Sequence, residues 1–453
     1  MKTFRMLSTS GILGYGFPED SLKRGMAREP HVIGADGGSV DGGPYYLGSG
    51  APLSSPRAMK RDISLMLAAA RERRIPLVIG TAGGSGGEPH LKLTADIVRE
   101  IARERGLHFR LALIHAEQDV ATLQKAYQAG RIQPLRNAPA ISAETFGRAA
   151  RTVAMMGPEP FMAALDGGAD VILAGRSSDP APWAGCAMHA GLPAAPSWFA
   201  GKMLECAAAS AKPKGADCLF AEVDEEGVVV EPTNPARRCT PGSIATFSLH
   251  ENTSPIEHTE PGGTLFTGDN AYVAVSDRAV RVTGMRWQPA DRYTVKLEAV
   301  EPVGFRAITF CATRDPGLIS VLDDYLVGVR ERVARSSADM GLGSDSFELV
   351  IRCYGRDGVM GMREPLRDHP GHEVGFLVEV VASSQEEASA VCALARTYML
   401  HGDFPRRLCN EGNMAIPLSP ADFAAGPAFR FSLHHAWMVD DPAAPFPIEW
   451  EEV

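Results

Sequence analysis

Four loops of this sequence carry glycines, hydroxyls and ionisable side chains directly after a short apolar run. The loops are Asp36–Gly50, Thr81–Gly87, the segment that starts at His115, and Arg176–Asp179. The continuous apolar runs before them are typical of parallel strands buried on both faces. In open parallel sheets, ligands bind beyond the carboxyl ends of the strands. We therefore expect the four loops to meet in one cleft that binds a small ligand.

The Asp36–Gly50 loop supplies candidates for proton transfer. Asp36 or Asp41 could act as a general base, and Tyr45 could donate a proton to a developing oxyanion. Ser39 lies between the two acids and is a candidate for binding the substrate. Carboxylate oxygens are also the ligands that Mg²⁺ prefers, so a metal site is an alternative. A third interpretation is structural, because Asp is a common turn former.

The Thr81–Gly87 loop is a candidate anion site between a strand and a helix. Glycines let backbone N–H groups approach an anion, and a helix N-terminus adds positive potential. The candidate contacts are Thr81, Gly83, Gly84, Ser85 and Gly86. The loop is neither a Walker A motif nor a clean G-x-G-x-x-G, so it gives no nicotinamide fingerprint. We expect it to bind a carboxylate or phosphate, with a flexible turn as the alternative.

The other two strand ends offer a histidine and an arginine. His115 stands where a general acid or base could act, although a structural histidine is as common there. Arg176 could bind a carboxylate through its guanidinium fork, with Ser177 and Asp179 beside it. The structural alternative is an ion pair between Arg176 and Asp179.

Two later segments also contain charged residues that could bind a ligand or form an ion pair. Arg238 precedes Cys239, and positive charge nearby lowers the pKa of a thiol; contact between an arginine and an acidic ligand is the stronger interpretation. Lys296 and Glu298 alternate along a predicted strand and share one face, which predicts a structural ion pair.

The elements that must position these residues divide the chain into three parts. Residues 1–215 alternate strands with amphipathic helices and predict an α/β ligand-binding domain with a parallel, Rossmann-like sheet. A helix at Ser197–Ser210 is expected to close this domain, and the expected strands are Phe4–Leu7, Val32–Ala35, Leu77–Gly80, Phe109–Ile114 and Val171–Ala174. Residues 216–340 read as a β-rich domain with a closing helix at about Pro316–Arg335. Residues 341–453 predict a small α+β domain, with strands at Phe347–Tyr354 and Glu373–Val381 and a helix that a capping box opens at Ser384.

Composition and charge restrict the function. The 453 residues carry a net charge of −10 without a long basic run, which argues against a nucleic-acid partner. No apolar stretch approaches the ~20 residues that span a bilayer. The eight cysteines show no C-x-x-C spacing, so we expect reduced thiols and a cytoplasmic location.

These segments together resemble the acyclic terpene utilisation AtuA family. The matching sequences are LGYGFPE at 13–19, DGGSVDGGPYYLGSG at 36–50, GTAGGSGG at 80–87, ADVILAGRSSDPA at 169–181, NPARRCTPGSIA at 234–245, YTVKLE at 293–298 and YGRDGVMG at 354–361. The resemblance implies bacterial catabolism of branched or carboxylated acyl compounds. It supplies no settled reaction. Some members carry a ferredoxin-like segment at their C-terminus, and the β-β-α pattern after Phe347 is either related to that segment or an ending particular to this branch of the family.

We therefore predict a lyase or hydratase that acts on a small carboxylate or an acyl-CoA thioester. Such chemistry needs a base, an acid and an anion site, which the four loops offer. The alternatives are a hydrolase or ligase that holds Mg²⁺ at Asp36 and Asp41, and a non-catalytic subunit of a coenzyme A enzyme. We expect a homodimer or higher homo-oligomer, with no nucleic-acid or membrane partner.

Overall fold

The computed structural model describes residues 3–252, 254–408 and 413–453. Contacts divide the chain into two compact units. Unit 1 comprises residues 1–301 and 431–453, and unit 2 comprises residues 302–430. No helix among these residues is long and apolar enough to cross a membrane.

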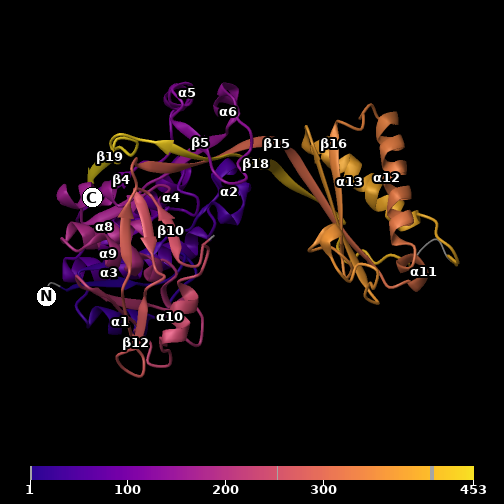
Figure 1. The fold of residues 1–453 in the computed structure, drawn as a ribbon. Coiled ribbons are helices and arrows are strands. Elements are labelled where there is room, and N and C mark those ends of the chain that lie inside the picture. The colour runs from indigo at the N-terminus through magenta and orange to yellow at the C-terminus, as the bar shows by residue number, and fades with distance from the viewer. Residues whose placement is uncertain (1–2, 253, 409–412) are drawn as a thin grey trace. The chain divides into compact units, whose positions relative to one another are not determined.

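A ten-stranded sheet forms the centre of unit 1 (Figure 1). Its five middle strands are parallel neighbours in the order β1 (Phe4–Ser8), β2 (Val32–Asp36), β3 (Leu77–Gly80), β7 (Val171–Ala174) and β4 (Arg110–Ile114). These are the five strands that the apolar runs predict. The α/β class is therefore confirmed, and the carboxyl ends of all five strands lie at one edge.

The outer strands make the sheet mixed rather than parallel throughout, which corrects the prediction. β8 (Leu219–Val223), β9 (Gly227–Pro232), β13 (Val280–Thr283) and β12 (Ala271–Ala274) extend it antiparallel beyond β1. β19 (Ile448–Glu452) pairs antiparallel with β4 at the other edge. Strands from the predicted middle region thus complete the sheet of the first region, and β8 pairs with the backbone groups at the edge of β1.

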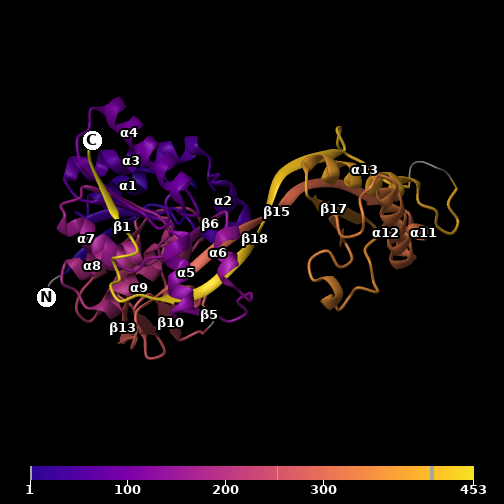
Figure 2. The same cartoon turned by 90° about the horizontal axis from the view of Figure 1, so that it is seen from above.

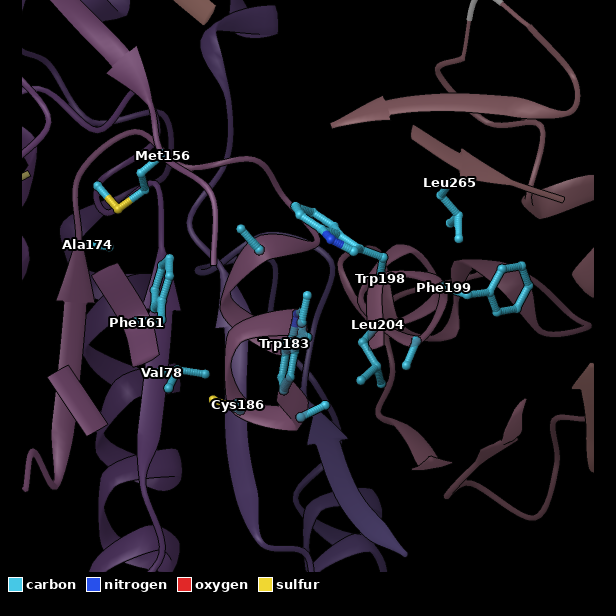
Figure 3. Close-up of a cluster of buried hydrophobic side chains, with 14 of the residues drawn as sticks. Val78, Met156, Phe161, Ala174, Trp183, Cys186, Trp198, Phe199, Leu204 and Leu265 are labelled. Carbon is cyan, nitrogen blue, oxygen red and sulfur yellow. The ribbon is translucent and has the colours of Figure 1, made fainter. Parts of the chain in front are cut away.

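Helices cover both faces of this sheet. α1 (Glu19–Met26), α3 (Pro56–Arg73) and α4 (Glu88–Arg105) pack on one face, and α7 (Glu159–Asp166), α8 (Ala181–His189) and α9 (Ala194–Leu204) pack on the other. Figure 3 shows the second face, where Trp183 and Phe161 lie close to Val78. The predicted helix at Ser197–Ser210 is realised as α9 and a short 3-10 helix, Ala207–Ser210. Both faces of the strands are therefore dry, as their continuous apolar runs indicate.

A small antiparallel sheet covers α9. It contains β10 (Glu257–Glu260), β11 (Gly263–Phe266) and β14 (Arg286–Pro289). The ring of Trp287 stacks on that of Trp198 at 5.3 Å, and Leu265 packs into the same core. This sheet brings β10 to the layer in which α8 and α9 lie.

The remaining elements of unit 1 are short apart from two strands that leave it. They are α2 (Pro44–Ser49), α5 (Val120–Gln128), β5 (Ile132–Pro134), α6 (Ala143–Arg148), β6 (Arg151–Met155), α10 (Pro241–Phe247) and a 3-10 turn at Val40–Gly42. β15 (Thr294–Thr313) pairs with β6 through Lys296–Val300 before it enters unit 2, and β18 (Asp422–Met438) returns to pair with β5.

Unit 2 is an antiparallel sheet with helices on one face. The strand order is β16 (Phe347–Tyr354), β17 (Val374–Ala382), β15 and β18. The helices are α11 (Pro316–Ile319), α12 (Leu322–Asp339) and α13 (Gln385–His401), and Figure 2 shows α12 and α13 together beside β17. A short 3-10 turn spans Gly361–Arg363.

The predicted elements of unit 2 are present in the expected order. The hydroxyl of Ser384 accepts a hydrogen bond from the amide of Glu387 at 3.2 Å, which is one half of the predicted capping box, while the carboxylate of Glu387 accepts from the hydroxyl of Ser383. The predicted helix at Pro316–Arg335 is interrupted after Ile319 and continues as α12 to Asp339. The three-domain division of the sequence stays a prediction, whereas contacts group the chain into the two units above.

Candidate functional site

Alternation along the strands decides which strand-end residues can meet. Val78, Ala174 and Ile114 belong to the core that α8 and α9 cover, while Ala35, Ile79, Leu173 and Leu113 belong to the core that α3 and α4 cover. Asp36 follows Ala35 and therefore faces the α8 and α9 layer, as Arg176 does two residues after Ala174. His115 follows Ile114 and faces the opposite layer. The sheet thus brings Asp36 and Arg176 together and separates His115 from them.

The glycine loop packs its backbone against the two neighbouring loops. Gly83, Gly84 and Gly86 have φ angles of +71°, +113° and +67°, which L side chains rarely adopt. A Cβ atom on Gly86 would overlap the backbone of Arg176, and one on Gly38 would lie 2.8 Å from the carbonyl oxygen of Gly84. The predicted convergence of these three loops at one place is therefore present, with backbone in direct contact.

The polar groups of this loop are partly used within the protein. The amides of Gly84 and Gly86 donate to carbonyls of the same loop, those of Thr81 and Ala82. The hydroxyl of Thr81 accepts a hydrogen bond from the amide of Ser177 at 3.2 Å. The buried hydroxyl of Ser85 has no hydrogen-bond partner among the residues that the structure describes. Thr81 and Ser177 thus hold two loops together, whereas Ser85 keeps an unused polar group.

Arg176 is buried and its charge is balanced inside the protein. Its Nε donates to Glu298 at 2.8 Å, and an Nη donates to Asp179 at 3.0 Å. Burial opposes the charge of this guanidinium, but Glu298 and Asp179 outweigh burial and raise its pKa. The structural alternative, an Arg176–Asp179 ion pair, is present. Binding of a ligand anion by Arg176 stays a prediction, and such an anion would compete with two carboxylates.

Glu298 connects this arginine to the predicted pair on β15. Lys296 Nζ lies 2.6 Å from Glu298 Oε1, which confirms the ion pair that strand alternation predicts. Burial would raise the pKa of Glu298, but Arg176 and Lys296 together lower it to about 2. Glu298 is therefore a permanent anion that fixes the position of Arg176.

Four further carboxyl groups form what we call the acidic cluster, namely Asp36, Asp179, Glu205 and Glu260. Burial raises the pKa of Asp36 well above its ordinary value, and the charge of Asp179 adds to the effect. Burial likewise raises the pKa of Glu205 to about 8 and that of Glu260 to about 7. Asp179 shifts in the same direction, against the charge of Arg176. Glu205 and Glu260 can therefore exchange protons near neutral pH.

Two bases complete the cluster. Lys202 Nζ lies 2.6 Å from Glu205 Oε1, and the surrounding carboxylates outweigh its burial and raise its pKa to about 12. The buried imidazole of His258, on β10, has no hydrogen-bond partner on either nitrogen in the described part of the chain. Burial and the charge of Lys202 lower its pKa to about 4, so the ring is neutral. Glu205, which is protonated at neutral pH, therefore lies near a fixed cation and an unused neutral imidazole.

Burial is the main cause of the raised pKa values, and the charge balance of the site adds to it. Together with the Arg176 pair, the site contains five carboxyl groups and three cations: Asp36, Asp179, Glu205, Glu260 and Glu298 against Arg176, Lys202 and Lys296. Full ionisation would leave an excess of two negative charges in a region shielded from water. Protonation of carboxyl groups removes this excess, because isolated buried charges are costly.

The other candidates of the Asp36–Gly50 loop, Ser39, Asp41 and Tyr45, are less buried than Asp36. The backbone amide of Asp41 donates to the hydroxyl of Ser39 at 3.1 Å, so Ser39 starts the short 3-10 turn, and the Asp41 residue is exposed. Tyr45 is 37 % exposed and its ring lies edge-on to Tyr46. The two acids of this loop therefore differ in environment, because only Asp36 enters the buried layer.

His115 lies between two glutamates on the opposite face of the sheet. Its Nδ1 is 2.9 Å from Glu88, the first residue of α4, and its Nε2 is 3.4 Å from Glu449 on β19. The histidine is half-buried. Its place is that of a residue linking α4 to the C-terminal strand, apart from Asp36 and Arg176.

The Arg238–Cys239 segment does not join the site either. Arg238 is exposed, and its backbone pairs with that of Lys212. Burial raises the pKa of the Cys239 thiol to about 12, so the expected lowering by neighbouring arginines is wrong. Seven cysteines lie among the described residues and all have free thiols; Cys409 lies outside them.

The described residues contain no group of three or more His, Cys, Asp or Glu placed to hold a metal ion. Asp36 and Asp41, the predicted Mg²⁺ ligands, lie in a buried and an exposed environment respectively. The Mg²⁺ alternative therefore gains no support from this geometry.

The sequence interpretation missed Lys202, Glu205, Glu260 and His258. A signal for the first two was available, because they are the charged residues of the otherwise apolar segment SWFAGKMLEC, 197–206, and stand one helical turn apart. Glu260 and His258 carried no comparable signal, since they lie on a short strand whose partner is set by tertiary packing.

Comparison with known proteins gives one match. The family model described as acyclic terpene utilisation family protein AtuA matches residues 56–402 of the 453. This range includes every residue of the acidic cluster except Asp36. No curated protein and no solved structure matches the chain.

Proposed function

Because the chain belongs to the acyclic terpene utilisation AtuA family, we propose that it is a catabolic lyase or hydratase whose acidic cluster transfers protons. The substrate is a small branched carboxylate or its coenzyme A thioester. The reaction takes place in the cytoplasm, where the free thiols of the chain stay reduced.

The acidic cluster beside Lys202 carries this proposal. Addition or elimination of water next to a carboxylate or thioester requires a base for the carbon-bound proton and an acid for the hydroxyl group. Glu205, with a pKa of about 8, is protonated at neutral pH and serves as the acid. Glu260, with a pKa of about 7, is the base, since efficient general bases titrate near the working pH. Asp36, whose pKa burial raises well above its ordinary value, is a second candidate for proton transfer.

Lys202 supports the anionic stage of the reaction. Removal of a proton next to a carbonyl places negative charge on the carbonyl oxygen, and a fixed cation in a shielded site stabilises that charge. Lys202 is 6 % exposed and stays charged, because its pKa is about 12. The neutral ring of His258 is available for a hydrogen bond to the same ligand.

Deuterium exchange tests proton transfer without knowledge of the full reaction. The protein is incubated in D₂O with a panel of small branched carboxylates and acyl-CoA thioesters, and deuterium at carbon is measured by mass spectrometry. We expect exchange with at least one compound. Glu205→Gln and Asp36→Asn should each lower its rate ~10²–10⁴-fold, the usual loss when an acid or base is removed.

Asp41→Asn is the matched control, because it makes the same change at the exposed acid of the same loop. It should leave the exchange rate almost unchanged. A chelator arm separates the metal-dependent alternative, which predicts that EDTA abolishes exchange. Absence of exchange and turnover for every compound, together with stable co-purification of a coenzyme A enzyme, would establish the non-catalytic subunit instead.

A further inference from the structure

β16 has an unpaired edge. It pairs with β17 over eight residues, Phe347 with Ala382 through Tyr354 with Gly375, and it ends the strand order of the sheet. No other strand in the described part of the chain lies on its far side. An open strand of this length is a template for a further strand, which natural proteins either block or use.

The odd-numbered residues of β16 face this edge. In an antiparallel ladder, alternate residues direct their N–H and C=O groups away from the partner strand. The carbonyl of Leu349 accepts from the Arg330 side chain on α12 at 2.8 Å, and that of Cys353 accepts from the following turn. Both carbonyls therefore point away from β17. Leu349 and Ile351 are also odd-numbered, so their amides point away from β17 and are available for pairing with another strand.

Two charged side chains of β16, Glu348 and Arg352, share one face of the sheet and differ in their partners. Glu379 on β17 accepts from Arg306 at 2.7 Å and from Arg352 at 2.6 Å, so one carboxylate serves two arginines. Arg352 is 40 % exposed at its side chain. Glu348, exposed and four residues before Arg352 on the same face, has no ion pair among the described residues. The strand thus offers one unshared acid and one half-shared base.

We propose that two copies of this chain associate by antiparallel pairing of their β16 edges, centred on Val350. This register places Glu348 of each copy opposite Arg352 of the other, so two cross-strand ion pairs form at once. It also sets Leu349 opposite Ile351, so that the edge-facing N–H and C=O groups of these residues form hydrogen-bonded pairs once the Arg330 side chain leaves the Leu349 carbonyl. The arrangement has twofold symmetry, in which each copy offers the same surface. Opposite charges that face each other across strands stabilise pairing.

Arg330 is the feature that opposes this association, because its side chain occupies the carbonyl of Leu349. The hydrogen bond is exposed, so water can replace it at little cost. In the dimer, the amide of Ile351 of the other copy takes this carbonyl. Arg330 therefore satisfies one edge carbonyl of β16 in the isolated chain and can be displaced when a second β16 strand pairs with this edge.

Disulfide trapping tests the register. The two Val350 residues would face each other as a non-hydrogen-bonded pair, with Cα atoms about 4.5 Å apart. This lies within the ~4.4–6.8 Å that a disulfide spans. Val350→Cys should therefore give a covalent dimer on mild oxidation of the full chain, seen by non-reducing electrophoresis. In the matched control Ser346→Cys, the two positions would be roughly 27 Å apart at ~3.4 Å per residue, and no more dimer should form than with the wild type.

Charge reversal tests the contacts. Glu348→Arg would place two arginines opposite each other twice, and it should raise the dimer dissociation constant about tenfold or more in sedimentation experiments. Glu225→Arg, an equal charge change on the β8–β9 turn of unit 1, should leave it unchanged. The proposal is overturned if the wild type stays monomeric at tens of micromolar, if Val350→Cys and Ser346→Cys cross-link equally, or if both charge variants dimerise like the wild type.

Discussion

The two faces of the central sheet receive very different groups from the same edge. On the α8 and α9 face, Asp36 and Arg176 enter a buried set of charges whose pKa values shift in both directions. On the α3 and α4 face, His115 bridges Glu88 and Glu449 near the surface. The comparison teaches that a strand end by itself does not define a site. The position of a residue in the alternation along its strand decides which layer of helices covers its side chain. Burial in that layer then decides whether the group can exchange protons at neutral pH.

Removal of the buried arginine charge should have the largest effect on stability. Arg176→Met leaves Glu298 and Asp179 buried with less compensation, and loss of one partner of a buried pair costs about 3–5 kcal/mol of unfolding free energy. Denaturation followed by tryptophan fluorescence measures this, because all five tryptophans lie in unit 1. The exposed Arg238→Met is the control and should change the unfolding free energy by less than about 0.5 kcal/mol. Equal effects of the two substitutions would contradict the assigned burial of the Arg176 charge.

Substitution of two glycines by alanine separates the cost of overpacking from the cost of a left-handed backbone. Gly86 lies where the loops of the candidate site touch, and Gly106 lies at the end of α4. Gly86 and Gly106 have φ angles of +67° and +62°, but only Gly86 has atoms near its missing Cβ, those of Arg176. Gly106→Ala should cost about 1–2 kcal/mol from the left-handed conformation alone. Gly86→Ala should cost about 1–3 kcal/mol more, the usual effect of overpacking. The same fluorescence experiment measures both, and an equal loss would show that the loops are not in tight contact.

The pH dependence of stability should separate the acidic cluster from Glu298. Glu205 keeps its proton to about pH 8 in the folded chain, whereas in the unfolded chain it ionises near 4.5. The folded state then binds more protons between these values, so stability falls as pH rises from about 4.5 to about 8. Glu298, with its pKa lowered to about 2, has the opposite effect: its contribution is present above about 4.5 and is lost as pH falls toward 2.

Glu205→Gln should flatten the upper part of this profile and leave the acidic part unchanged. Unfolding free energies measured from pH 2 to 9 check this expectation. A variant with the same slope as the wild type between pH 5 and 8 would mean that Glu205 does not hold the proton.

The smallest effect is expected on the other face. His115→Ala removes a half-buried residue between two partly exposed carboxylates, and pairs of this kind contribute about 0–1 kcal/mol. Deuterium exchange, if present, should stay near the wild-type rate because His115 lies outside the acidic cluster. A loss as large as that of Glu205→Gln would place the chemistry on the α3 and α4 face instead.

Local patterns in the sequence predicted the parts of this protein that local physics controls. The apolar runs identified the five parallel strands, since strands buried on both faces have no polar alternation. Alternation along 293–298 predicted the Lys296–Glu298 ion pair, and Ser384 predicted a helix start. The convergence of the Asp36, Thr81 and Arg176 loops followed from the rule that parallel strands end at one edge.

Only the tertiary structure decided what surrounds these loops. β15 brings Glu298 beside Arg176 from 122 residues away, α9 supplies Lys202 and Glu205, and β10 supplies Glu260 and His258. Long-range packing of this kind leaves no periodic trace in the sequence, and neither does the pairing of β19 with β4. The pKa values of the acidic cluster depend on burial and on charges contributed by these distant elements. The sequence by itself therefore determined that the Asp36, Thr81 and Arg176 loops meet. The fold separated His115 from them, contrary to the sequence prediction, and it determined which carboxyl groups are buried deeply enough to have a raised pKa.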